Sequence, residues 1–127
     1  MSDIQIREIK QTDNSAVAEM IRYVLVEQGA PKVGTAYEDP ILDELFEYYD
    51  SKRAAYFVLL KANKIMGSSG ISQLEGADAN ICELQKMYFH PDVRGLGLGQ
   101  KMMEVCLDFA REQGFSECYI ETLPSMT

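Results

Sequence analysis

Three glycines alternate with leucines in the segment RGLGLGQ, residues 94–100, directly before a long helical pattern. Glycine costs chain entropy on folding and packs no side chain, so the spacing indicates that something approaches the bare backbone. The candidates are a phosphate, a tight turn or a close neighbouring strand. Unpaired N–H groups at a helix N-terminus bind phosphate, and Arg94 at the mouth of the loop can hold a further phosphate oxygen through its planar fork.

Local charge favours an anion site at this loop. The whole chain has a net charge of -8, whereas residues 84–101 carry Lys86, Arg94 and Lys101 against Asp92 alone, a balance of +2. The remaining residues therefore carry -8 minus 2, or -10. Chance clustering of three cations is the alternative explanation. An acidic surface disfavours nucleic acid and anionic membranes as partners.

Two common phosphate-binding motifs do not fit the loop. A Walker loop needs GxxxxGK followed by Ser or Thr, but Gln100 follows Gly99. The dinucleotide fingerprint GxGxxG needs a glycine where the chain has Gln100 or, one repeat later, Met102. A nucleotide-binding domain of another kind is therefore a remote alternative.

Apolar periodicity predicts the elements that position the loop. We expect strands over 3–10, 54–62, 64–74, 81–89 and 115–123, and helices over 12–29, 40–52 and 96–114. Residues 62–64, Ala-Asn-Lys, are expected to form a hairpin turn. The order is β-α-α-β-β-β-α-β, and the last β-α-β unit must be a right-handed parallel crossover. The sequence predicts a single α/β (α+β) domain over 1–127, with a mixed, mostly antiparallel sheet flanked by helices.

The segment ELQKMYFHPDVRGLGLG, residues 83–99, resembles the acyl-CoA signature of the GCN5-related N-acetyltransferase (GNAT) family. The family pattern is Gln or Arg, two residues, Gly, one residue, then Gly or Ala. Here these positions read Arg94, Gly95, Leu96, Gly97, Leu98 and Gly99. The element order is also similar, so the resemblance covers nearly the whole chain and implies the GNAT fold.

The resemblance implies acetyl-CoA as cosubstrate and no metal. The pantetheine arm would lie between strands 81–89 and 117–123, paired with the backbone of Met87, Tyr88 and Phe89. The pyrophosphate would sit on the N–H groups from Gly95 to Gln100. A backbone N–H near Phe89 would polarise the thioester carbonyl, and such an oriented donor is worth about 3 kcal/mol in the transition state.

Glu83 is the candidate general base. An amine with a pKa near 10 is protonated at neutral pH and cannot attack. Glu83 stands where many family members place a glutamate that acts through water; a structural carboxylate or a solvated strand residue is the alternative. The implied activity is transfer of acetyl to a primary amine by direct attack in a ternary complex. A small molecule or a peptide is the expected acceptor, and an acyl-CoA-binding module without turnover is the alternative function.

The chain departs from the family at its end, ETLPSMT. Family members usually continue with another helix and further strands, and that helix commonly carries the tyrosine that protonates the departing thiolate. No residue here can be assigned that role, and the domain is expected to be C-terminally truncated. Uncovered apolar surface would favour association with a partner or with a second copy as a homo-oligomer.

The remaining features point to an ordinary cytoplasmic protein. No signal peptide or membrane-length apolar run is present. Cys82, Cys106 and Cys118 have no metal spacing and are expected to be buried free thiols. An acidic run is expected to be the wet face of a helix or to attract a cationic acceptor; it comprises Glu38, Asp39, Asp43, Glu44, Glu47 and Asp50.

Overall fold

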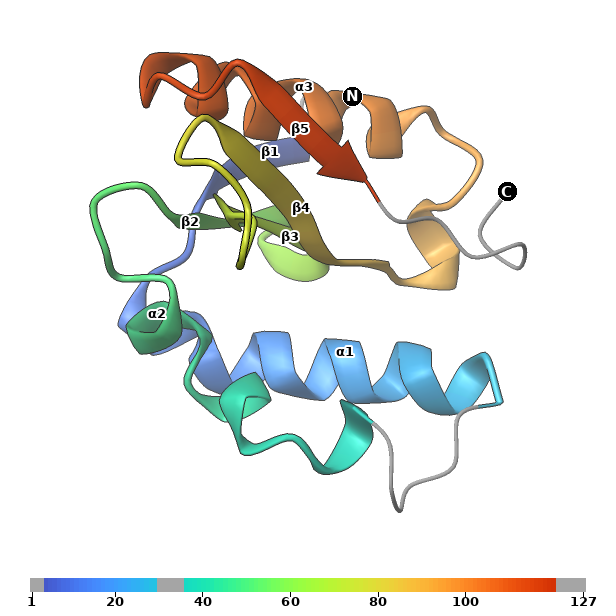
Figure 1. Ribbon diagram of the computed structural model, residues 1–127. Coiled ribbons are helices and arrows are strands. Elements are labelled where there is room, and N and C mark those ends of the chain that lie inside the picture. The colour runs from blue at the N-terminus through green and yellow to red at the C-terminus, as the bar shows by residue number, and fades with distance from the viewer. Residues whose placement is uncertain (1–3, 30–35, 121–127) are drawn as a thin grey trace.

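The computed structural model describes residues 4–29 and 36–120 of the chain (Figure 1). The α-helices and strands of these segments are β1 Ile4–Glu8, α1 Asn14–Glu27, α2 Leu45–Tyr48, β2 Ala55–Lys61, β3 Lys64–Gln73, β4 Ile81–Phe89, α3 Leu98–Glu112 and β5 Glu117–Ile120. Short 3-10 turns occur at Gln11–Asp13, Ala36–Glu38, Pro40–Asp43 and Pro91–Val93. The predicted order β-α-α-β-β-β-α-β is confirmed. Within these two segments no helix is long and apolar enough to span a membrane.

The strands form one sheet in the order β1-β2-β3-β4-β5. The first four strands pair antiparallel with their sequence neighbours. β5 pairs parallel to β4, with Ile81 opposite Glu117 and Leu84 opposite Ile120, after the crossover through α3. The predicted mixed, mostly antiparallel sheet is therefore confirmed. Residues 121–123 of the predicted last strand lie outside the described residues.

The predicted hairpin turn between β2 and β3 is confirmed. Ala62 and Asn63 both have positive φ, 52° and 68°, and Lys61 pairs with Lys64. Two left-handed central residues give the turn whose twist matches that of the flanking strands, and asparagine tolerates this conformation well.

The sheet separates two apolar cores, with α3 on one face and α1 and α2 on the other (Figure 1). The first six residues of β2 are all buried. Phe57 and Leu59 belong to the core under α3, whereas Tyr56, Val58 and Leu60 belong to the core under α1. This double burial explains why β2 is a continuous apolar run instead of an alternating one.

The helix predicted over 40–52 is the element whose structure differs most clearly from the prediction. A 3-10 turn, Pro40–Asp43, is followed by the short helix α2, Leu45–Tyr48, and Glu44 between them leaves helical geometry at φ -134° and ψ 33°. The N–H of Phe46 bonds the side-chain Oδ1 of Asn14 at 2.9 Å. A tertiary hydrogen bond thus replaces the local ladder, while Leu42 and Leu45 are still buried.

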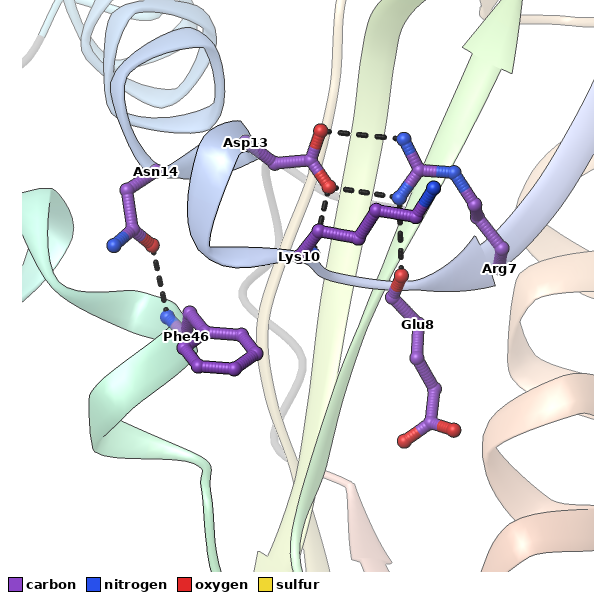
Figure 2. A network of polar contacts seen from close by, with 6 residues as sticks. All are labelled: Arg7, Glu8, Lys10, Asp13, Asn14 and Phe46. Carbon is purple, nitrogen blue, oxygen red and sulfur yellow. Dashed lines mark hydrogen bonds and ion pairs between the residues drawn. The ribbon is translucent and has the colours of Figure 1, made fainter.

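Figure 2 shows the polar network that joins β1 to α1 and α2. Both guanidinium ends of Arg7 donate to the Asp13 carboxylate, at 2.7 and 3.2 Å. The backbone N–H of Lys10 donates to Asp13 at 2.7 Å. These hydrogen bonds, foremost those from Arg7, lower the pKa of Asp13 from its usual value of 3.8. Because Asp13 is only 8% exposed, the network is largely screened from water.

We expect Asp13→Ala to lower the free energy of unfolding by about 2–3 kcal/mol at pH 7, since the half-buried guanidinium of Arg7 loses its carboxylate partner and keeps only its bond to the Glu8 carbonyl. The lowered pKa of Asp13 makes its contribution full above pH 3.8, and that contribution is lost as pH falls through the folded-state pKa. Urea unfolding at a series of pH values measures both effects. The control is Asp108→Ala, which breaks the exposed Asp108–Arg111 pair and should cost at most about 0.5 kcal/mol. Equal losses in the two variants would contradict the prediction.

Candidate active site

The glycine loop leads from β4 into α3 and leaves its backbone open. Gly95 and Gly97 have positive φ, 78° and 75°, and a Cβ added at either would meet no atom of the described residues within 4 Å. Left-handed backbone is therefore what requires glycine at these two positions. A close neighbouring strand, one of the three candidates from the sequence, is wrong. Gly99 is helical, and its added Cβ would only touch the Phe89 ring at 3.8 Å, so the fold does not itself demand glycine there.

The loop ends at the N-terminus of α3, a helix of 15 residues that begins at Leu98. Its N-cap is Gly97, which has no side chain to bond the first N–H groups. The helical ladder starts only at Lys101, whose N–H faces the Gly97 carbonyl at 3.5 Å. The N–H groups of Leu98, Gly99 and Gln100 precede that ladder, and with the helix dipole they can hold an anion.

Arg94 lies at this loop but is already engaged within the chain. Its Nε donates to the Phe89 carbonyl at 3.0 Å. Its two terminal nitrogens donate to the Glu27 carboxylate at 2.9 and 3.2 Å, and this pairing lowers the pKa of Glu27. Tyr23, one helical turn before Glu27, stacks on His90 with ring centroids 4.9 Å apart. The last turns of α1 therefore contact the segment before α3 through Arg94 and His90. The sequence did not predict these contacts.

β4 carries a bulge in the middle of the candidate site. Opposite β3, Gln85 pairs with Gly70 and Tyr88 pairs with Ser68, so β4 has one extra residue between these pairs. Lys86 is the extra residue, and its backbone is left-handed with a φ of 50°. The Tyr56 hydroxyl donates to the Lys86 carbonyl at 2.9 Å. Such bulges bend a strand and interrupt pairing.

Beyond the bulge, the predicted acyl-CoA residues of β4 alternate between the two faces of the sheet. Met87 and Phe89 pack on the core under α3, whereas Tyr88 packs on the core under α1. Pairing with β5 stops at Leu84 in the described part of the chain. Residues 87–89 lie beyond this point. Their stretch of β4 has β3 on one edge and no described partner on the β5 edge.

Glu83 lies before the bulge, half-buried at the paired end of β4 and β5. Its Oε1 accepts a hydrogen bond from Gln85 Nε2 at 2.8 Å, and Gln85 Oε1 accepts one from the Tyr49 hydroxyl at 2.7 Å. Its register partner on β5 is Tyr119, whose side chain is 48% exposed. Glu83 is thus both held by the protein and beside an exposed ring. Gln85 could have been found from the sequence as a same-face neighbour two residues away, but Tyr49 could not.

Several carboxylates of the acidic run form hydrogen bonds or ion pairs with other residues of the chain. Asp43 receives two bonds from Arg22, at 2.7 and 3.0 Å. Glu47 accepts bonds from Gln11 and Asn14, and Asp39 lies 3.9 Å from Lys86 Nζ. The run therefore organises the segment around α2, in addition to any effect on a cationic acceptor.

The cysteines and possible metal ligands were also located. Cys82 and Cys106 are buried free thiols as predicted, while Cys118 is half-buried. Burial is the main reason that the pKa of Cys82 and of Cys106 is raised to about 12, so neither is a nucleophilic thiolate at neutral pH. Over residues 4–29 and 36–120, no group of three or more His, Cys, Asp or Glu side chains could hold a metal.

Comparison with known proteins gives consistent matches. The model of the Acetyltransferase (GNAT) family matches residues 18–127. The chain is 42% identical over 118 residues to the uncharacterized N-acetyltransferase YjgM of Escherichia coli strain K12, covering 92% of this chain and 71% of that protein.

Solved structures show the same fold. One is a predicted acetyltransferase from Clostridium acetobutylicum with acetyl-CoA, at TM-score 0.80 and 15% identity, covering 97% of this chain and 83% of that one. Another is an aminoglycoside acetyltransferase from an uncultured soil metagenomic sample in complex with sisomicin, at TM-score 0.72 and 17% identity, covering 98% and 80%. These similarities confirm the expected GNAT fold. With the match over residues 18–127 and the 42% identity, they show that the chain belongs to the GNAT family of acetyltransferases.

Proposed function

We propose that this protein transfers the acetyl group of acetyl-CoA to a primary amine by direct attack in a ternary complex. The observation that carries the proposal is the open N-terminus of α3, where left-handed Gly95 and Gly97 leave the backbone uncovered. This site lies beside the stretch of β4 that pairs only with β3 in the described chain. A phosphate-binding helix end next to an available strand edge suits a ligand with a pyrophosphate and an amide-containing arm.

In this proposal the pyrophosphate contacts the N–H groups from Gly95 to Gln100, through Leu96, Gly97, Leu98 and Gly99. Arg94 contributes positive charge at the same loop. The pantetheine amides pair with the backbone of Met87, Tyr88 and Phe89. No metal is required, because polarisation of the thioester carbonyl comes from a backbone N–H near Phe89.

The proposed reaction exchanges one bond at the thioester carbon. The amine nitrogen forms a C–N bond with this carbon, the C–S bond breaks, and its electron pair leaves with the sulfur of CoA. The ammonium group first gives one proton to the Glu83 carboxylate through a water molecule and so becomes the free amine. After the C–N bond forms, the nitrogen loses its second proton to solvent, and the departing thiolate takes a proton from solvent. The raised pKa of the Cys82 and Cys106 thiols supports direct transfer over an acyl-enzyme at either residue.

The acceptor is proposed to be a cationic small molecule or a peptide amine. The net charge of -8 attracts cations over long range, and the soil-sample neighbour is an aminoglycoside acetyltransferase. Free thiols at Cys82, Cys106 and Cys118 suit a cytoplasmic setting.

Calorimetric titration with acetyl-CoA, with ATP and NAD as controls, tests the ligand. We expect acetyl-CoA alone to bind. Amine-dependent release of free thiol is then measured with spermidine, sisomicin, free lysine and a lysine-containing peptide. Thiol release with at least one class supports the enzyme. Binding without release in any class would support an acyl-CoA-binding module, and binding of ATP or NAD alone would contradict both.

A further inference from the structure

Three side chains on the α1-facing side of the sheet form a hydrogen-bonded chain that ends on Glu83. The Tyr49 hydroxyl donates to Gln85 Oε1 at 2.7 Å, and Gln85 Nε2 donates to Glu83 Oε1 at 2.8 Å. Glu83 and Gln85 are two residues apart on β4, so their side chains leave the same face. Tyr49 comes from the layer that covers this face of the sheet, directly after α2.

The direction of this chain is fixed by the chemistry of its ends. An ionised carboxylate only accepts hydrogen bonds, so the amide of Gln85 must turn its NH₂ group toward Glu83. The amide oxygen then faces Tyr49 and needs a donor. Burial above all, followed by neighbouring groups including Glu83, strongly raises the pKa of the Tyr49 phenol, which therefore keeps its proton at working pH. Each of the three residues presents the group that its neighbour requires.

The fold makes room for Tyr49 at the sheet. A Cβ on Gly70 of β3 would lie 2.7 Å from Cζ and 2.8 Å from the hydroxyl of Tyr49. The Tyr49 ring packs on Tyr56 with centroids 5.0 Å apart, and Tyr49 is only 3% exposed. The missing side chain at Gly70 is thus the space through which the Tyr49 hydroxyl reaches β4.

Asn14, whose bond to Phe46 is drawn in Figure 2, helps to hold the segment that carries Tyr49. Asn14 accepts the N–H of Phe46 at 2.9 Å and donates to Glu47 at 2.8 Å. Gln11 donates to the same carboxylate at 3.0 Å. These contacts anchor α2 at both Phe46 and Glu47, and they therefore support the segment that places Tyr49 at the sheet.

We propose that Tyr49 and Gln85 are positioning residues that hold the Glu83 carboxylate in the orientation needed to accept the proton of the acceptor amine. This inference rests on the proposed function, in which Glu83 is the base. Neither residue contacts the reacting atoms. Tyr49 fixes the amide of Gln85, and Gln85 fixes one carboxylate oxygen, which leaves the other oxygen for the water or the amine.

The test is a double-mutant cycle with Tyr49→Phe and Glu83→Gln, using the amine that releases most thiol. We expect Tyr49→Phe to lower kcat about tenfold, as the loss of one orienting hydrogen bond does. The KM for acetyl-CoA should stay within about twofold, because the ring is retained. In the Glu83→Gln background, Tyr49→Phe should have no further effect on kcat, since it acts through Glu83.

Gln85→Met is a second variant of similar shape, and it should lower kcat as Tyr49→Phe does without adding to it. Tyr48→Phe is the matched control, because it removes the hydroxyl of an adjacent tyrosine that is 53% exposed, and should leave kcat unchanged. A normal kcat in Tyr49→Phe, or an equal loss in both backgrounds, would overturn the positioning role alone. A normal kcat in Glu83→Gln would overturn the role of Glu83 as the base and the positioning role with it. Absence of thiol release by the unsubstituted chain would instead overturn the proposed function itself.

Discussion

Replacing Gly97 by aspartate is expected to weaken acetyl-CoA binding at least about a hundredfold. Gly97 is the N-cap of α3 and has a φ of 75°. An aspartate there would place a carboxylate at the N–H groups proposed for the pyrophosphate. Like charges about 5 Å apart near a protein surface repel by about 3 kcal/mol, which corresponds to about a hundredfold in affinity. Calorimetric titration with acetyl-CoA measures the effect.

Two control variants separate charge from shape and from backbone strain. Gly97→Asn has nearly the same shape without the charge, and asparagine tolerates left-handed backbone, so its loss should be nearer about tenfold. Gly76→Asp introduces the same residue into the turn between β3 and β4, at a φ of 80° with nothing near its Cβ. This variant should bind acetyl-CoA normally. Normal affinity in Gly97→Asp would remove the phosphate role from the loop.

Replacing Glu83 by glutamine is expected to lower kcat by about a hundredfold near pH 7, the lower range for loss of a general base. Acetyl-CoA affinity should be nearly unchanged, because glutamine keeps the shape and can still accept the bond from Gln85. The deficit should be largest at low pH and narrow as pH rises, since a growing fraction of the amine is then already unprotonated. Rates of thiol release between about pH 6 and pH 9 give the profile.

Glu117→Gln is the matched control for this variant, because it removes an equal charge from an exposed position on the neighbouring strand β5. It should leave the rate profile unchanged. If Glu83→Gln releases thiol at the unsubstituted rate throughout the profile, another group or bulk water takes the proton, and Glu83 is a structural carboxylate.

Most of the fold could be predicted because its signals are local. The alternation in β1, the hairpin at Ala62 and Asn63, and the apolar stripe of α3 each lie within one stretch of sequence. The break at Glu44 within the segment 40–52 could not be predicted, because the N–H of Phe46 that follows it bonds Asn14, 32 residues earlier in the chain. A helical period in the sequence shows which side chains are buried, but not whether the backbone between them is continuous.

The candidate site shows the same contrast between features with a local sequence signal and contacts made by residues far apart in the sequence. The loop Arg94–Gln100 could be predicted from residue types and spacing, and Glu83 could be predicted from the resemblance to the GNAT family. Their partners could not, because Glu27 is 67 residues from Arg94 and Tyr49 is 36 residues from Gln85. The bulge at Lys86 gave no signal either, since lysine is neither glycine nor asparagine and left-handed backbone is uncommon for it.

The extra residue at Lys86 shifts the alternation of side chains along β4 by one position. In a strand that continued regularly through Lys86, Met87 would share the face of Glu83 and Gln85, and Tyr88 would point toward α3. Carbonyl and N–H directions alternate along a strand with the same period as side chains. The inserted residue therefore also resets which peptide groups beyond Gln85 face the open edge. β4 therefore has two alternation patterns: Glu83 and Gln85 lie in the first, and residues 87–89, which have no described partner on β5, lie in the second.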